Sequence, residues 1–104
     1  MVKIQGTTIS MTRGDTLIVN VEIDNYTPQG DDVIRFACAR SYVSSEVAIR
    51  KTIPNDTLTL RLDPADTKDL AYGDYVYDIE LTYADGRVDT FIAGATLRLT
   101  EEVE

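Results

Sequence analysis

The sequence contains no histidine, no tryptophan and a single cysteine among its 104 residues. Histidine is the commonest general base and the commonest metal ligand, so its absence excludes Ser-His and Cys-His nucleophile pairs. One cysteine excludes an internal disulfide and any zinc site made of several thiolates. The sequence therefore predicts a protein that is not an enzyme and binds no metal and no cofactor.

Positive charge is also scarce, with 10 Lys and Arg residues against 18 Asp and Glu, which gives a net charge of -8. This balance disfavours partners held by phosphate neutralisation, so we expect neither nucleic acid nor a membrane surface as a partner. No run approaches the ~20 apolar residues that cross a bilayer, and residues 1–4 are not followed by the apolar segment of a secretory signal. We expect a cytoplasmic product in which Cys38 stays reduced and lies in the core.

Hydrophobic residues are plentiful, at 43%, and they recur at every second position along most of the chain. This period predicts strands with one buried face. We expect seven strands, at about residues 4–11, 17–23, 34–38, 46–50, 57–63, 75–83 and 88–100. The predicted core residues are Leu17, Val19, Val21, Phe36, Leu58, Leu60, Tyr77, Ile79 and Leu97.

Two further strand faces are predicted less directly. Val47 and Ile49 alternate with polar neighbours, which places both of them inward. In the last strand, Gly94 indicates a bulge that switches faces. We expect Phe91, Leu97 and Leu99 to point inward, with Val88 and Ile92 on the other face.

Local signals separate the strands. Asp85-Gly86 between two apolar runs predicts a tight hairpin. Asp63 as cap, Pro64 at the first helical position and Asp66 at the third predict a helical turn before the sixth strand. Tyr75 or Tyr77 is then placed to donate a hydrogen bond across this corner.

Together these features predict an all-β fold, a seven-stranded antiparallel immunoglobulin-like β-sandwich with one short helical turn before the sixth strand. A closed small barrel is the competing fold. Residues 1–100 form the single predicted domain, and residues 101–104 form an acidic, frayed tail.

Several motifs have both a functional and a structural interpretation. Residues 13–15 (RGD) match an integrin-recognition tripeptide, but they also fit turn chemistry before a strand. Asp63, Asp66 and Asp69 have no recognised calcium-loop spacing, and capping explains the first two. The outward arginines are expected to pair across strands with outward carboxylates. These are Arg35, Arg50, Arg61 and Arg98, with Glu22, Glu46, Asp78 and Glu80.

Four motifs resemble those of immunoglobulin-like modules in tailed bacteriophages and prophages, similar to the N-terminal domain of phage baseplate upper proteins. They are residues 12–16 (TRGDT), 62–67 (LDPADT) followed by Leu70, 73–79 (GDYVYDI) and 85–90 (DGRVDT). The resemblance covers about residues 10–99. It implies a non-enzymatic structural or assembly protein, baseplate- or tail-associated or accessory, that is present in the host cytoplasm during assembly and then in the virion. The implied partners are other virion proteins or further copies of the chain.

Two surfaces are the predicted docking sites. The segment 43–52 is the predicted sheet edge, because Ser44, Ser45, Arg50 and Lys51 give it the polar character of edge strands. The loop 26–32 is the second surface, with Tyr26 as its candidate anchor. The predicted partner-binding residues are Tyr26, Gln29, Tyr42, Arg50 and Lys51. The alternative function is a carbohydrate-binding β-sandwich, which exposed and coplanar Tyr42 and Tyr72 would favour.

Overall fold

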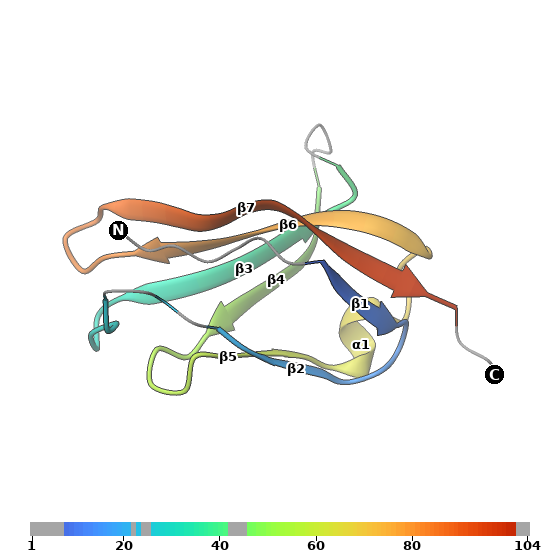
Figure 1. The fold of residues 1–104 in the computed structure, drawn as a ribbon, viewed down its shortest axis with the longest axis horizontal. Coiled ribbons are helices and arrows are strands. Elements are labelled where there is room, and N and C mark those ends of the chain that lie inside the picture. Colours follow the sequence, from blue (N-terminus) through green and yellow to red (C-terminus); the bar gives the residue numbers. More distant parts are fainter. Residues whose placement is uncertain (1–7, 22, 24–25, 42–45, 102–104) are drawn as a thin grey trace.

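The structure is a computed structural model that describes residues 8–21, 23, 26–41 and 46–101. Strands dominate this part of the chain, so the all-β prediction is confirmed. The described elements are β1 (Ile9–Thr12), β2 (Leu17–Asn20), β3 (Val33–Ala39), β4 (Val47–Ile53), β5 (Thr59–Leu62), α1 (Pro64–Thr67), β6 (Gly73–Thr82) and β7 (Val88–Thr100). They form a five-stranded sheet in the order β1-β7-β6-β3-β4 and a two-stranded sheet of β2 and β5 (Figure 1). In the described residues the strands thus form two separate sheets and not one closed barrel.

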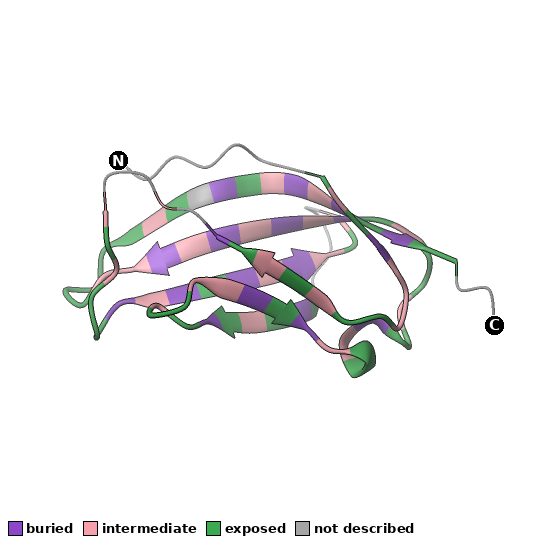
Figure 2. Cartoon of the chain, turned by 60° about the horizontal axis from the view of Figure 1, so that its bottom comes forward, coloured by how far each residue is buried: buried purple, intermediate pink, exposed green. Residues whose placement is uncertain are grey.

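The core lies between the two sheets. Alternate residues of β3, β5 and β6 are buried, and Figure 2 shows this alternation along the strands. Phe36, Leu60, Tyr77, Ile79 and Leu97 are buried as predicted, each with at most 3% of its surface exposed. The side chains between them on β3 and β6 lie on the opposite face of the five-stranded sheet. We call this opposite face the outer face.

The prediction of a purely antiparallel fold is wrong, because β1 pairs with β7 in parallel. Ile9 lies opposite Leu97, and Thr12 lies opposite Thr100. The turn after β1 contains Gly14, with φ of 85°, and leads the chain into β2 of the other sheet. β1 and β2 are consecutive in the sequence but belong to different sheets, so they do not pair. The alternation of side chains indicates which residues face inward, but it does not indicate whether neighbouring strands are parallel or antiparallel.

Bulges change the face of two predicted positions. On β7, Ala95 pairs with Tyr77 and Ile92 with Ile79, so β7 contains one residue more than β6 over this stretch. Gly94 lies in the bulge with φ of 68°, as the predicted change of face requires. Ile92 is consequently buried and the prediction that it points outward is wrong, whereas Val88 is 58% exposed. The side chain of Phe91 lies outside the described residues.

Val47 is the second case, since it was predicted inward and is 44% exposed. Cys38 pairs with Ile49, but Ala39 pairs with Val47, so β4 has an extra residue there and Val47 turns outward.

Leu58 precedes β5 with φ of 52° and is half-buried, although it packs against the core. A positive φ ends the extended geometry that the alternation implied. The predicted core residues Leu17 and Val19 are likewise half-buried and pack against the core, whereas Val21 is buried as predicted.

The corner between β5 and β6 follows the sequence closely. Pro64 begins α1, and the Asp66 carboxylate accepts a hydrogen bond from the Asp63 backbone N–H at 2.7 Å. The Tyr75 hydroxyl donates to the Ala71 carbonyl at 2.9 Å, which confirms the predicted bond across the corner. Gly86, with φ of 94°, closes the predicted hairpin between β6 and β7.

Candidate functional site

The structure divides the predicted partner-binding residues between two regions. Tyr26 and Gln29 lie in the loop that precedes β3, whereas Arg50 and Lys51 lie on β4, at one edge of the five-stranded sheet. Tyr42 lies outside the described residues. The topology thus places β4 at the edge, where the sequence located it, but the predicted residues form no single surface.

The buried carboxylate of Asp32 connects the loop of residues 26–32 to the hairpin between β6 and β7, and we call this part of the molecule the loop end. This group accepts hydrogen bonds from the Tyr26 hydroxyl, from the Gln29 backbone N–H at 2.8 Å and from the Ala84 backbone N–H at 3.2 Å. The bond from the Gln29 N–H, followed by the one from Tyr26, lowers the pKa of Asp32. The hydrogen bond to Asp32 in turn raises the pKa of Tyr26 to about 12.

The Tyr26 ring packs edge-on against Tyr83, with ring centroids 5.3 Å apart. Asn55 joins the loop from the next turn, since its amide donates to the carbonyls of Gln29 and Asp32 at 2.6 and 3.0 Å. Both the ring and the hydroxyl of Tyr26 therefore contact residues of the same chain. Gln29 is exposed, and its side-chain amide donates to the Thr27 carbonyl at 2.7 Å.

Lys51 is also engaged internally. It lies between the buried residues Ile49 and Ile53 on the core-facing side of β4. Its ammonium group reaches the Asp66 carboxylate at 2.8 Å and the Asp63 carboxylate at 3.8 Å, near α1. An inward-pointing charge of this kind protects an edge strand against promiscuous pairing. Lys51 lies two residues from both Ile49 and Ile53 along the sequence. This spacing is the signal that indicates the inward direction of the Lys51 side chain.

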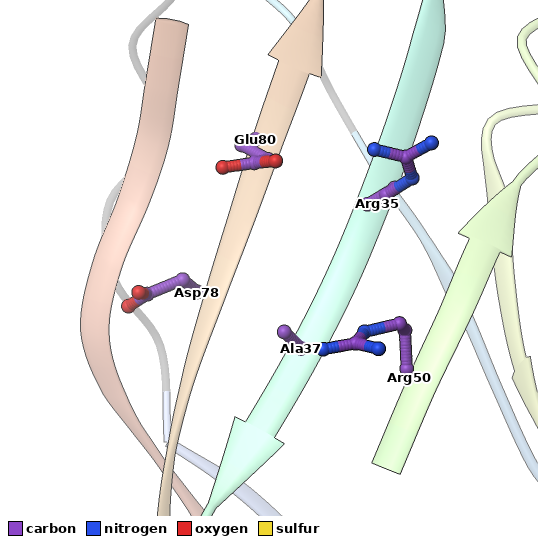
Figure 3. Close-up of a pocket in the computed structure, with 5 residues that line it drawn as sticks. All are labelled: Arg35, Ala37, Arg50, Asp78 and Glu80. Carbon is purple, nitrogen blue, oxygen red and sulfur yellow. The ribbon is translucent and has the colours of Figure 1, made fainter. Parts of the chain in front are cut away.

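Arg50 has a different environment, because it lies on the outer face together with Arg35. These two arginines, with Ala37, Asp78 and Glu80, line a shallow depression of about 450 Å³, which we call the charged depression (Figure 3). Figure 3 shows the carboxylates on β6 and the guanidinium groups on β3 and β4, on either side of Ala37. The small Ala37 side chain leaves space at the centre.

The strand register explains this grouping. Ala37 pairs with Asp78 on one side and with Arg50 on the other, while Arg35 pairs with Glu80. All of them have the same orientation because side chains alternate along each strand. A second hollow of about 160 Å³ shares Ala37 and Asp78 and continues the depression toward Ala39 and Val76.

Two of the four outward arginines form ion pairs in the described residues, but with carboxylates other than the predicted ones, and Glu22 lies outside the described residues. Arg98 on β7 pairs with Asp74 on β6 at 2.8 Å, and Arg61 on β5 pairs at 2.8 Å with Asp63, the residue that follows this strand. Within the part of the chain that the structure describes, neither Arg35 nor Arg50 forms an ion pair, and Glu80 forms none either. The charged depression therefore holds three charged groups, Arg35, Arg50 and Glu80, that form no ion pair in this part of the chain.

Asp78 is the exception within the charged depression. Its carboxylate accepts a hydrogen bond from the Gly94 backbone N–H at 2.7 Å and so satisfies a donor that the β7 bulge frees. The depression as a whole combines two cations and two anions around a small side chain. Such an arrangement suits salt-bridged contact with a protein surface of alternating charge.

The other sequence motifs have structural roles. In the turn of residues 13–15, the Arg13 guanidinium stacks on the Tyr72 ring at 4.1 Å and donates to the Leu70 carbonyl at 3.1 Å. The Gly14 N–H donates to the buried Thr67 hydroxyl at 2.8 Å, so this turn is bound to the chain's own corner. Burial raises the pKa of the Cys38 thiol to about 12, which keeps it in the unreactive protonated form.

Among the residues that the structure describes, no group of three or more His, Cys, Asp and Glu side chains is arranged to hold a metal ion. No helix in that part of the chain is long and apolar enough to cross a membrane. No protein-family model and no curated protein sequence matches the chain.

Proposed function

We propose that this chain is a non-enzymatic immunoglobulin-like module of a tailed bacteriophage or prophage that acts through protein–protein contacts on its outer face. The observation that carries the proposal is the charged depression, where Arg35, Arg50 and Glu80 have no ion-pair partner in the described chain. Charged groups that form no ion pair in the described chain are available to a partner. An edge strand, β4, borders the same face.

The strand order supports an immunoglobulin-like assignment. In the variable type of that fold, strands G, F, C and C′ lie side by side in one sheet, and strand B neighbours strand E in the other. The orders β7-β6-β3-β4 and β2-β5 agree with this pattern. The Tyr75 bond to Ala71 at the start of β6 corresponds to the tyrosine corner of such domains. The parallel β1 then represents a first strand that has moved to the sheet of β7.

The motifs that resemble phage modules lie at positions that define this architecture. Residues 62–67 form the end of β5 and α1, and residues 85–90 form the hairpin into β7. These two motifs account for local features of the fold. We place the protein in the host cytoplasm during assembly and then in the virion, as a baseplate-associated, tail-associated or accessory component.

No observation favours carbohydrate binding over protein contact. A sugar-binding platform needs aromatic rings with a free face. One face of the Tyr72 ring is covered by the Arg13 guanidinium, and Tyr26 packs against Tyr83. Tyr42 lies outside the described residues, so the expected coplanar pair with Tyr72 has no support.

The test is to isolate phage particles and assembly intermediates from the bacterium that carries the gene and to search for this chain by mass spectrometry. We expect the wild-type chain to be found in one of these fractions. The double variant Arg35→Glu/Arg50→Glu should be incorporated at least tenfold less. A matched control, Arg61→Glu/Arg87→Glu, makes the same change in net charge away from the outer face and should be incorporated normally.

Absence of the wild-type chain from both particles and intermediates would contradict the phage assignment. Equal incorporation of the two double variants would contradict the assignment of the outer face as the docking surface. Circular dichroism and thermal unfolding of each variant show that a loss of incorporation does not come from a loss of folding.

A further inference from the structure

We infer that the outer face binds a second copy of this chain across a two-fold axis, with the arginines of each copy over the carboxylates of the other. The inference rests on the proposed function, because it names one partner of the same face. Its basis is the arrangement of charge in the depression. The cations lie on β3 and β4, and the anions lie on β6 (Figure 3).

This arrangement is self-complementary. Consider a two-fold axis that runs parallel to the strands, between the two stacked outer faces and midway between β3 and β6. This axis places β6 of one copy over β3 of the other. The β6 carboxylates of one copy then lie over the β3 arginine of the other, and the reverse contact follows by symmetry. Arg35 would face Glu80 of the second copy, and Arg50, on β4, would lie over β7 of the second copy, beside Asp78 on its β6. Every contact thus occurs twice.

The shape of the depression agrees with this contact. Ala37 is flanked by longer side chains, and the resulting space is open to solvent. In a face-to-face dimer this space on β3 faces Asp78 of the second copy, so it accommodates that side chain without displacing the sheet. The adjoining hollow beside Ala39 and Val76 adds apolar surface to the contact.

The available area predicts a weak dimer. The seven residues of β3, at about 3.3 Å each, and four strands at about 4.8 Å spacing give a flat area of ~450 Å² per copy. The total of ~900 Å² is at the small end of specific protein interfaces. The net charge of -8 on each copy also opposes association. We therefore expect a Kd of about 100 μM, which becomes significant where many copies are held close together.

The experiment is sedimentation equilibrium of the full chain from about 10 μM to about 1 mM, a range that brackets the expected Kd. The wild type should change reversibly from monomer to dimer. Arg35→Glu alone, and Glu80→Arg alone, should each weaken dimerisation at least tenfold because like charges then face each other. An equimolar mixture of these two variants should regain dimers. In the mixed dimer, the glutamate introduced at position 35 of one copy faces the arginine introduced at position 80 of the other, and the second contact is unchanged.

The control Arg61→Glu should dimerise like the wild type, because its side chain is exposed on the other sheet. A wild type that stays monomeric throughout overturns the inference, and so does a mixture that fails to regain dimers. A failure of dimerisation does not decide the particle experiment. If the chain is monomeric but still needs Arg35 and Arg50 for incorporation, its outer face binds another protein.

Discussion

The two faces of the five-stranded sheet are made from alternating residues of the same strands, yet their polar and charged groups have different roles. On the core side, Phe36 and Ile79 are buried, and the Lys51 charge is neutralised by Asp66. On the outer face, Arg35, Arg50 and Glu80 have no ion pair within the described chain. Burying an unpaired charge costs several kcal/mol, so only the solvated face can retain charges for another purpose.

The largest expected effect separates two neighbours on β3. Phe36→Ala should reduce the free energy of unfolding by ~3–5 kcal/mol, because it leaves a cavity in a fully buried site. Arg35→Ala should change it by less than about 0.5 kcal/mol, as exposed substitutions do. Urea denaturation of both variants measures this difference. A loss above about 1 kcal/mol for Arg35→Ala would mean that the outer face contributes to folding.

The next effect concerns Asp32, which is buried and holds the loop end. Its pKa is lower in the folded state than its ordinary value of 3.8. The carboxylate therefore contributes stability above that value, and the contribution is lost as the pH falls through the lower folded pKa. Asp32→Asn should lower the urea midpoint at neutral pH, because the new amide N–H₂ faces backbone donors. The difference from wild type should shrink below about pH 3.

The matched control for this pH dependence is Asp31→Asn, which removes the same charge from the adjacent exposed residue. Its difference from wild type should be small at every pH. A pH dependence equal to that of Asp32→Asn would show that general charge repulsion, and not the bonds to Asp32, stabilises the loop.

A smaller effect is expected at the corner before β6. Tyr75→Phe removes the hydroxyl that donates to the Ala71 carbonyl, and it should cost about 1 kcal/mol, the typical value for one hydrogen bond. Tyr72→Phe is the control, because that ring is partly exposed and contacts Arg13 through its face. Thermal unfolding of the two variants should differ accordingly. Equal midpoints would contradict a stabilising corner bond.

An effect of similar size distinguishes two carboxylates of the charged depression. Asp78→Ala should cost about 0.5–1.5 kcal/mol because the Gly94 N–H in the bulge loses its acceptor. Glu80→Ala should be neutral for stability within about 0.5 kcal/mol. Chemical denaturation compares them directly. Equal losses would mean that Glu80 also serves the fold.

The sequence predicted the elements that depend on neighbouring residues. The caps of α1, the Gly86 hairpin and the Tyr75 bond all join residues only a few positions apart, and all three are present. The alternation also placed Phe36 and Leu60 correctly. Val47 and Ile92 were assigned to the wrong face because a bulge shifts the register by one residue, and that shift depends on the partner strand.

The candidate site was predicted only in part for the same reason. Arg50 was identified as a surface residue of the edge strand, but its grouping with Asp78 and Glu80 depends on the pairing of three strands. The sequence predicted that these groups would neutralise each other across strands. It could not show that Ala37 separates Arg50 from Asp78, since that requires knowing that Ala37 lies opposite both residues.

The most direct test of the outer face as a docking surface is arginine modification with phenylglyoxal, read residue by residue with mass spectrometry. It compares the dilute free chain with the chain in purified particles. Arg35 and Arg50 should react readily in the free chain and become protected in particles, whereas Arg61, on the other sheet, should react equally in both. Unchanged reactivity of Arg35 and Arg50 in particles would contradict the assignment of this face as the interface.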